Sequence, residues 1–535
     1  MKLIKTDYAL VIFPIISLFG GLWQGQFTDD GYHWGFMFSN ALDLLDGKTP
    51  YKEIFFEYGI LSPIIHAITL KIFSNNVLSL IGITCFFYSL SIFFIGKIIQ
   101  KFTLNSYYSF ISTLVLFMIY PWPVTPWPNF ISFFFTTLFA FFYLSEKKIY
   151  NILGGLALGL AYLSLTTVYN FIIFFFILII TIFILINFKY LKANFIKKNI
   201  YFITSFTFLI GIFIFYLALN NLFLIWIKYQ QLPFIMSDIV DINIYTQIIN
   251  YIYFLFIYSI KNFIYEPQLF FFLIIFISNI IIILNLAKNF YKYKKFSDKE
   301  LNLFVINILI FSLNIYAQLS DIDKFATSIS LGIISLIYLI DSFKNVDKKI
   351  ISNFIVLFIS SYSFIFAFGL ENAKHGASRN AYFKDLKNIN ENYTSKKISY
   401  FNKQKWSKNT WHHLNLFDEI QGSIKKKCNI EYGANLTSNA YYYVLLEYKK
   451  IQVIPFFYKD LGKEFRSFFD KDIIKKLQKL IDNNNIILAT SENNHKFFNL
   501  ENYANPKKID LNLYNKKLNK FLYIYYPKKC DFISY

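Results

Sequence analysis

The chain has little cysteine and almost no arginine. The first shortage excludes a disulfide-rich protein, and the second limits what the lysine content can say about function. Three cysteines cannot build a disulfide framework: Cys85 lies in an apolar run, and only Cys428 and Cys530 share the polar C-terminal part, which leaves one late disulfide open. Among 53 basic residues only Arg379 and Arg466 are arginine. With the abundance of Ile, Asn, Phe and Tyr, this indicates an A+T-rich coding bias, so the abundance of lysine alone says little about function.

Apolar residues dominate the composition. Hydrophobic residues make up 56% of the chain and aromatic residues 21%, with a positive mean hydropathy, which is too apolar for a water-soluble protein of 535 residues. Lys2 and Lys5 precede the first apolar run, as in a signal peptide, but no small-residue cleavage site follows and further apolar runs do. We therefore expect an integral membrane protein whose first apolar run is an uncleaved helix.

Eleven or so apolar runs come near the ~20 residues that a helix needs to cross a bilayer. They lie at 8–26, 77–96, 105–121, 128–144, 150–166, 168–188, 200–226, 266–287, 301–319, 325–341 and 350–369. The predicted fold class is mainly α: a polytopic membrane bundle of about 11 transmembrane helices, with amphipathic surface helices in its first exterior loop and a small C-terminal α/β domain outside the membrane.

The distribution of lysine predicts the orientation of this bundle. The N-terminus and every second loop are basic, which the positive-inside rule places in the cytoplasm. The alternation requires that Tyr245 to Ile264, rich in Tyr and Asn, lies in the interface or re-enters instead of crossing. We therefore predict a multi-pass protein of the bacterial plasma (inner) membrane with a cytoplasmic N-terminus. The segments expected on the exterior face are 28–58, 121–128, 227–265, 320–324 and everything after 370.

The chain changes character after residue 370. Residues 371–535 hold 29 Lys and Arg against 16 Asp and Glu, a balance that suits an anionic membrane surface or an acidic polymer, with no aromatic-basic signature of nucleic-acid binding. We expect a transmembrane catalytic domain at 1–370, a connector at 371–425 and a soluble α/β domain at 426–535. No Gly-rich phosphate loop occurs there. The expected strands are 429–433, 451–455, 485–490 and 521–526, with helices at 439–448 and 471–482.

The first exterior loop carries the strongest functional signal. It contains Thr28-Asp29-Asp30-Gly31-Tyr32, then Gly47-Lys48-Thr49-Pro50-Tyr51, then Phe55-Phe56-Glu57-Tyr58-Gly59. Paired carboxylates at a membrane exit are costly to keep beside hydrocarbon, which favours a chemical role, although an acidic helix cap is the simpler interpretation. Stretches 32–45 and 61–73 have a rough helical period, and we expect both to lie along the membrane surface.

This pattern resembles the first exterior loop of GT-C membrane glycosyltransferases that use polyprenyl-phosphate sugars, such as protein O-mannosyltransferases and the aminoarabinose transferases of lipid A. The resemblance covers residues 8 to about 75 and implies catalytic roles for Asp29, Asp30 and Glu57. Where those enzymes have Glu-Lys-Pro, or an acid, His and Pro-Pro, this chain has Glu57-Tyr58-Gly59. The identities of donor and acceptor therefore do not carry over.

Further residues are candidates for substrate binding. Tyr51 and Lys52 close the turn of the first loop. Asp321, Asp323 and Lys324 form a charged turn at the exterior mouth, where Lys324 would pair with the lipid phosphate and Asp323 would orient it, unless the turn is ordinary loop charge. Arg379, with His375 nearby, is a second phosphate candidate, since a guanidinium contacts phosphate oxygens in pairs. His412 and His413 lie too far from other ligands to indicate zinc, and we expect them at the surface.

The resulting hypothesis is an inverting sugar transfer at the exterior face. Asp29 would take the proton of an acceptor hydroxyl, on a lipid, glycan or protein, while the polyprenyl phosphate of the donor leaves. The sequence fixes no cofactor: oxygen-rich pairs suit Mg²⁺ or Mn²⁺, whereas class members resembling mannosyltransferases act without a metal. The alternatives are an envelope polysaccharide polymerase or ligase, a lipid-linked sugar flippase, or a catalytically inactive relative whose acids are structural.

Overall fold

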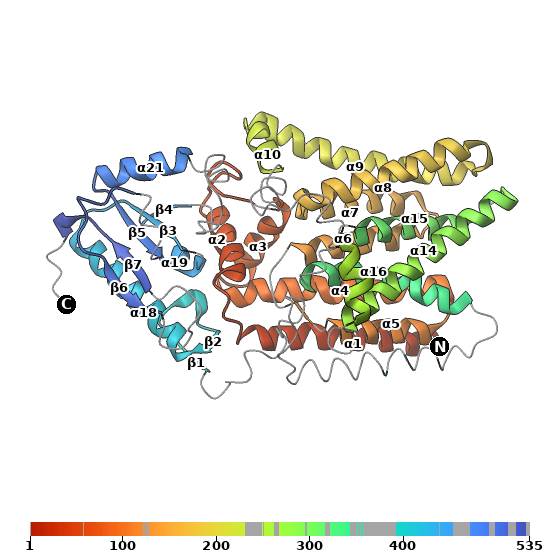
Figure 1. Ribbon diagram of the computed structural model, residues 1–535, viewed down its shortest axis with the longest axis horizontal. Helices are drawn as coiled ribbons and strands as arrows, with labels where there is room; N and C mark the ends of the chain where they lie inside the picture. Colours follow the sequence, from red (N-terminus) through yellow and green to blue (C-terminus); the bar gives the residue numbers. More distant parts are fainter. Residues whose placement is uncertain are drawn as a thin grey trace.

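The structure is a computed structural model. It describes residues 2–56, 58–120, 122–123, 128–230, 249, 251–261, 267–294, 297–315, 322–342, 350, 354, 357, 392–437, 439–452, 471–491, 498–511 and 521–530, and the statements below concern these residues. A long helical bundle occupies one side of the molecule and a smaller domain with a sheet lies against one end of it (Figure 1).

Ten long helices form the bundle within the described ranges. They are α1 (Lys2–Gly25), α4 (Val77–Thr103), α5 (Ser106–Ile119), α6 (Asn129–Tyr143), α7 (Lys148–Ser164), α8 (Thr166–Asn187), α9 (Ala193–Leu219), α14 (Pro267–Tyr293), α15 (Asp298–Ile315) and α16 (Ile322–Ser342). The 77–103, 166–190, 193–219 and 270–293 segments are long and apolar enough to cross a membrane on their own, and several of the others are shorter apolar helices. The chain is therefore a mainly helical membrane protein, as predicted.

The helices match the predicted spans in position but not always in extent. The span expected at 200–226 is wrong at both ends, because α9 begins at Ala193 and stops at Leu219, and a separate helix α10 (Phe223–Gln230) follows. Asn221 between them has a φ of 56°, a left-handed conformation that Asn tolerates and that ends the helix. The span expected at 350–369 lies almost wholly outside the described residues, so the number of eleven stays a prediction.

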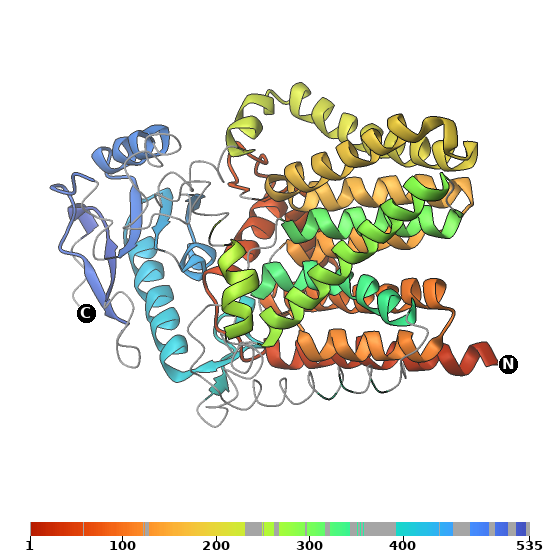
Figure 2. The same cartoon turned by 45° about the vertical axis from the view of Figure 1, so that its right-hand side comes forward.

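Two shorter helices follow the first span, as expected for the first exterior loop. They are α2 (His33–Leu45) and α3 (Leu61–Ile72). The expectation that α2 is amphipathic is wrong, because every residue from Trp34 to Asp43 is buried, while its position along the membrane surface stays a prediction. Figures 1 and 2 show the reason: α2 lies between the bundle and the C-terminal domain, where helix α19 (Ala440–Leu445) packs against it. The periodicity of the α2 sequence cannot show that a helix about 400 residues further along the chain packs against it.

The C-terminal domain is built on a five-stranded mixed sheet. Its strands are β3 (Tyr432–Leu436), β4 (Lys449–Ile451), β5 (Ile486–Ser491), β6 (Lys507–Asp510) and β7 (Phe521–Tyr525), in the order β4-β3-β5-β7-β6. The first three in that order are parallel and β7 and β6 are antiparallel to their neighbours. Helix α21 (Lys471–Asp482) has the predicted bounds, and three of the expected strands are found with shifts of a few residues as β3, β5 and β7. The strand expected at 451–455 shares only Ile451 with β4, and 453–455 lie outside the described residues. Edge strand β6, in which only Ile509 is buried, was not expected.

Part of the expected connector is folded onto this domain. Strands β1 (Asn392–Thr394) and β2 (Lys405–Ser407) pair antiparallel, and the 20-residue helix α18 (Lys408–Lys427) follows directly. Trp406, Trp411 and Leu414 are fully buried in a hydrophobic cluster that also takes in Trp34 and Phe38 of α2. One apolar core therefore runs from the membrane part into the C-terminal domain.

A disulfide closes the far end of α18. Cys428, the residue after the helix, is bonded to Cys530, at a Cα–Cα distance of 5.8 Å and a sequence separation of 102 residues. Cys85 is a buried free thiol in α4. The late disulfide that the sequence left open is thus formed.

Candidate active site

The acidic turn between α1 and α2 lies beneath the C-terminal domain. Three of its carbonyl oxygens accept hydrogen bonds from that domain: Lys405 N donates to Gln26 O at 2.6 Å, Trp406 Nε1 to Thr28 O at 2.9 Å and Ala440 N to Gly31 O at 2.8 Å. Gly31 leaves no room for a side chain, since a Cβ there would meet the Asn439 amide at 2.0 Å. The turn is therefore fixed by residues from two distant parts of the sequence.

The two aspartates of this turn have different surroundings. Asp29 is exposed, and its Oδ2 accepts a short hydrogen bond from Thr410 Oγ1 in the first turn of α18. Asp30 is partly buried and its Oδ1 accepts from the backbone N–H of Tyr32 at 3.1 Å and of His33 at 2.8 Å. Asp30 thus stabilises the start of α2, as the helix-cap interpretation predicted, while Asp29 presents a carboxylate to solvent.

His33 is the member of this group that sequence reasoning missed. Its Nδ1 lies 2.6 Å from Asp30 Oδ2, and its side chain keeps 28% of its surface exposed. An Asp and a His three residues apart at the start of a helix face each other, and that spacing was the available signal. Asp30 therefore orients the His33 imidazole within the acidic turn.

The Gly47–Tyr51 turn anchors the C-terminal domain through a buried charge cluster. Lys48 Nζ lies 2.6 Å from Asp43 Oδ1 and donates to Tyr443 OH at 2.8 Å, and that hydroxyl donates to Asp43 Oδ2 at 2.7 Å. Burial raises the pKa of Asp43, which is 1% exposed, while the charge of Lys48 opposes that rise. Burial also disfavours the charged form of neighbouring Lys450 and so lowers its pKa, while the charge of Asp43 opposes that fall. Asp43 was not a sequence candidate.

The two substrate candidates that close this turn differ in access. Tyr51 has a φ of 63°, is 2% exposed and packs its ring against Phe56 and Tyr229, at centroid distances of 5.4 and 5.7 Å. Within the described part of the chain its hydroxyl has no hydrogen-bond partner. Lys52 is exposed. Lys52 is accessible to a phosphate, whereas Tyr51 as a substrate ligand stays a prediction.

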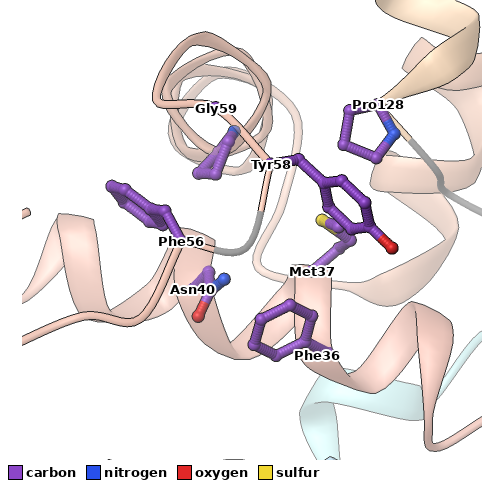
Figure 3. Close-up of a pocket in the computed structure, with 8 residues that line it drawn as sticks. Phe36, Met37, Asn40, Phe56, Tyr58, Gly59 and Pro128 are labelled. Carbon is purple, nitrogen blue, oxygen red and sulfur yellow. The ribbon is translucent and has the colours of Figure 1, made fainter. Parts of the chain in front are cut away.

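A small, mainly apolar pocket lies between α2 and the loop that leads to α3. Figure 3 shows Phe36, Met37 and Asn40 of α2 facing the loop that leads to α3, with Pro128 at the start of α6. The loop contributes Phe56, Tyr58 and Gly59, and Pro63 of α3 completes the lining. Asn40 is the polar member, and it is held by Nδ2 donating to Phe55 O at 3.1 Å and by Gln452 Nε2 donating to its Oδ1 at 2.6 Å. The C-terminal domain therefore braces this pocket too.

Five candidates cannot be placed fully. Glu57, Asp321 and Arg379 lie outside the described residues. Asp323 and Lys324 lie in the first turn of α16, and the structure describes their backbone only. Among the side chains that are described, no group of three or more His, Cys, Asp or Glu comes together as a metal site. His412 is exposed as expected, but His413 turns inward and its Nδ1 lies 3.1 Å from Tyr442 OH.

Comparison with known proteins gives structural neighbours only. The sequence matches no protein-family model and no curated protein. The crystal structure of ArnT from Cupriavidus metallidurans bound to undecaprenyl phosphate is similar, at a TM-score of 0.48 and 8% identity, over 97% of this chain and 98% of that chain. The Archaeoglobus fulgidus oligosaccharyltransferase in complex with Zn and sulfate is similar at a TM-score of 0.47 and 12% identity, over 96% of this chain and 72% of that chain. Both neighbours are GT-C glycosyltransferases, the class that the first loop resembles. At these scores neither similarity assigns a role to any residue.

Proposed function

We propose that the chain is a membrane glycosyltransferase that moves a sugar from a polyprenyl-phosphate donor to an acceptor hydroxyl, with inversion, on the exterior face of the membrane. The observation that carries the proposal is the acidic turn, in which Asp29 is exposed while its neighbour Asp30 is used to orient His33. The Asp29 carboxylate is therefore accessible to an acceptor hydroxyl, at a turn that the C-terminal domain holds in place.

Asp29 acts as the general base in this proposal. Its carboxylate takes the proton of the acceptor hydroxyl as that oxygen attacks the anomeric carbon, and the bond from the anomeric carbon to the phosphate oxygen breaks. The polyprenyl phosphate leaves with the bonding electron pair. General-base assistance contributes about 10²–10⁴-fold to such a step. Asp30 contributes by orienting the His33 imidazole. Glu57 is proposed as the third carboxylate of the site.

Cationic residues are proposed to bind the leaving phosphate. Lys52 is the exposed cation of the first loop. Lys324 and Arg379 extend this role to the mouth of the bundle, with Asp321 and Asp323 orienting Lys324. Positive charge aimed at the developing phosphate charge stabilises the transition state more than the ground state. No step of the proposal uses a metal ion.

Two observations support the exterior location of the site. The first is the Cys428–Cys530 disulfide, because disulfides persist in oxidising compartments outside the cytoplasm. The second is the alternation of basic loops, which is that expected for a cytoplasmic N-terminus. In Figures 1 and 2 the N-terminus lies at the end of the bundle away from the C-terminal domain. We propose a catalytic membrane domain at 1–370, a connector at 371–425 and an exterior domain at 426–535. The folded part of the connector, from Asn392 onward, packs with the exterior domain and is counted here as part of the C-terminal domain.

The test is release of polyprenyl phosphate from synthetic sugar-loaded carriers by the purified protein, with undecaprenyl phosphate, the lipid bound to ArnT, as the first carrier. Asp29→Asn should reduce turnover by at least about 100-fold while the protein remains folded. Asp46→Asn is the matched control, because Asp46 is an exposed aspartate of the same loop. An Asp29→Asn protein that turns over like the wild type would refute the assignment, and a wild type inert toward every carrier would refute the function.

A further inference from the structure

Thr410 occupies a fixed position at the start of α18. It is 5% exposed, and its backbone N–H donates to Oγ of the N-cap residue Ser407 at 3.2 Å. The next residue, Trp411, is fully buried, and its Nε1 donates to Tyr393 O at 2.8 Å. Side-chain capping of this kind defines where a helix begins and limits motion in its first turn. The position of the Thr410 hydroxyl is therefore set by contacts that do not involve Asp29.

The direction of the hydrogen bonds follows from proton counting. An ionised carboxylate can only accept, so the single hydroxyl proton of Thr410 goes to Asp29 Oδ2. The Ser407 and Thr410 hydroxyl oxygens lie 3.0 Å apart, and Ser407 is then the donor of that pair. The result is a chain from Ser407 through Thr410 to Asp29. Successive hydrogen bonds polarise one another, which strengthens the last bond to the carboxylate.

Helix α18 adds an electrostatic contribution in the same direction. The contact with Asp29 is made by the first turn of a 20-residue helix, whose N-terminal end carries partial positive charge. The carboxylate is therefore stabilised in its ionised form, the form that a general base needs. The opposite end of α18 is tied down by the Cys428–Cys530 disulfide.

We infer that the C-terminal domain completes the active site, with Thr410 as the positioning residue that holds the Asp29 carboxylate toward the acceptor hydroxyl. The inference rests on the proposed function of Asp29. It goes beyond that function because it assigns a role in turnover to a domain that contributes no atom to the reaction itself. A merely adhesive contact would affect stability and leave the pH dependence of turnover unchanged.

The experiment compares Thr410→Val with Thr410→Ser in the full-length protein, by pH–rate profile and by separate kcat and KM. Loss of a hydrogen bond to a charged group corresponds to a fall of about 10- to 100-fold in kcat, with KM for the donor nearly unchanged. The acid limb of the profile should move to higher pH in Thr410→Val, because the bond favours the ionised carboxylate. Thr410→Ser should restore both the rate and the profile.

The controls separate this inference from its premise. Thr394→Val makes the same change at an exposed threonine of β1 and should leave kcat and profile as in the wild type. If Thr410→Val does not fold, Thr410→Ala gives the same comparison with a smaller side chain. An active wild type with an unchanged Thr410→Val or Thr410→Ala profile overturns the inference alone, whereas an inactive wild type overturns the proposed function.

Discussion

Lys48 and Asp43 form a buried ion pair, with Nζ 2.6 Å from Oδ1, and the hydroxyl of Tyr443 bonds to both partners across a sequence gap of about 400 residues. The Asp43 side chain is 1% exposed and that of Lys48 is 19% exposed. The buried charge of Asp43 is tolerated because Lys48 and Tyr443 bond to it. Removal of Asp43 or Lys48 leaves the charge of the other uncompensated. The cluster therefore makes the seating of the C-terminal domain on α2 depend on a few side chains.

Asp43→Ala should destabilise the protein by about 3–5 kcal/mol, because Lys48 and Lys450 would stay near an empty site. Thermal unfolding in detergent measures the effect. The double variant Asp43→Ala/Lys48→Met should recover part of the loss, since it removes the uncompensated charge. Equal stability of the single variant and the wild type would mean that the pair does not hold the domains together.

Acid should weaken the fold through His413. Burial, with the neighbouring charge of His412, lowers the pKa of His413 to about 4. Between the ordinary pKa of about 6.5 and this value the unfolded chain binds more protons than the folded one, so the free energy of unfolding falls as pH decreases through that window. His66, fully buried in α3, also has its pKa lowered by burial, to about 4, and contributes in the same direction.

Thermal unfolding from pH 7.5 to 4.5 tests the His413 contribution. His413→Gln should lose less stability over this range than the wild type, because Gln does not titrate and retains a partner for Tyr442 OH. The difference should not exceed about 1.4 kcal/mol per pH unit. His412→Gln removes only the smaller, charge contribution to the lowered pKa of His413 and should change the curve less than His413→Gln. Parallel curves for His413→Gln and the wild type would rule this contribution out.

The disulfide should contribute measurably to stability. Closing a loop of 102 residues restricts the unfolded chain by an amount that corresponds to about 3–5 kcal/mol. Cys428→Ser/Cys530→Ser should therefore unfold at a lower temperature, and a reductant should lower the unfolding temperature of the wild type but not of the double variant. Identical behaviour of both proteins with and without reductant would show that the bond does not form in the membrane-derived protein.

Labelling tests the proposed orientation. Lys52→Cys places a thiol at an exposed position of the first loop, and a membrane-impermeant maleimide should label it on intact cells. Lys147→Cys places one at the opposite end of the bundle and should react only after permeabilisation. Background labelling should be low, because Cys85 is buried and the other two cysteines are bonded. The reverse pattern would put the acidic turn in the cytoplasm and end the proposed mechanism.

The sequence predicts well what depends on neighbours along the chain. The apolar runs give the bundle helices, and the spacing of apolar residues gives α2 and α3 nearly to the residue and α21 to the residue. Strands β5 and β7 are recognisable because short runs of β-branched and aromatic residues lie between polar segments, whereas β3 overlaps its predicted range only at Tyr432 and Gly433. Strand β6 is not recognisable, since only Ile509 of its four residues is buried and the rest are polar.

The sequence cannot predict what depends on distant partners. The exposed carboxylate of Asp29 is expected from the motif, but Thr410, which holds it, is 381 residues away and has no distinguishing local pattern. Asp43 looks like an ordinary polar residue on the outer face of a helix until the tyrosines of α19 cover it. The proposed chemistry of the candidate site therefore rests on a local motif, whereas the contacts that support the motif are a property of the tertiary fold.

The bonds from residues 405, 406 and 440 to the acidic turn also bear on biogenesis. Trp406 follows Thr28 by 378 residues. At a synthesis rate of about 5–20 residues per second, the residues that bond to the acidic turn are therefore made roughly 20–75 s after the turn itself. Until then Tyr400 and Phe401, whose rings contact Phe38, have not been synthesised either. A truncated or stalled chain would consequently expose apolar surface and lack the hydrogen bonds that fix the acidic turn.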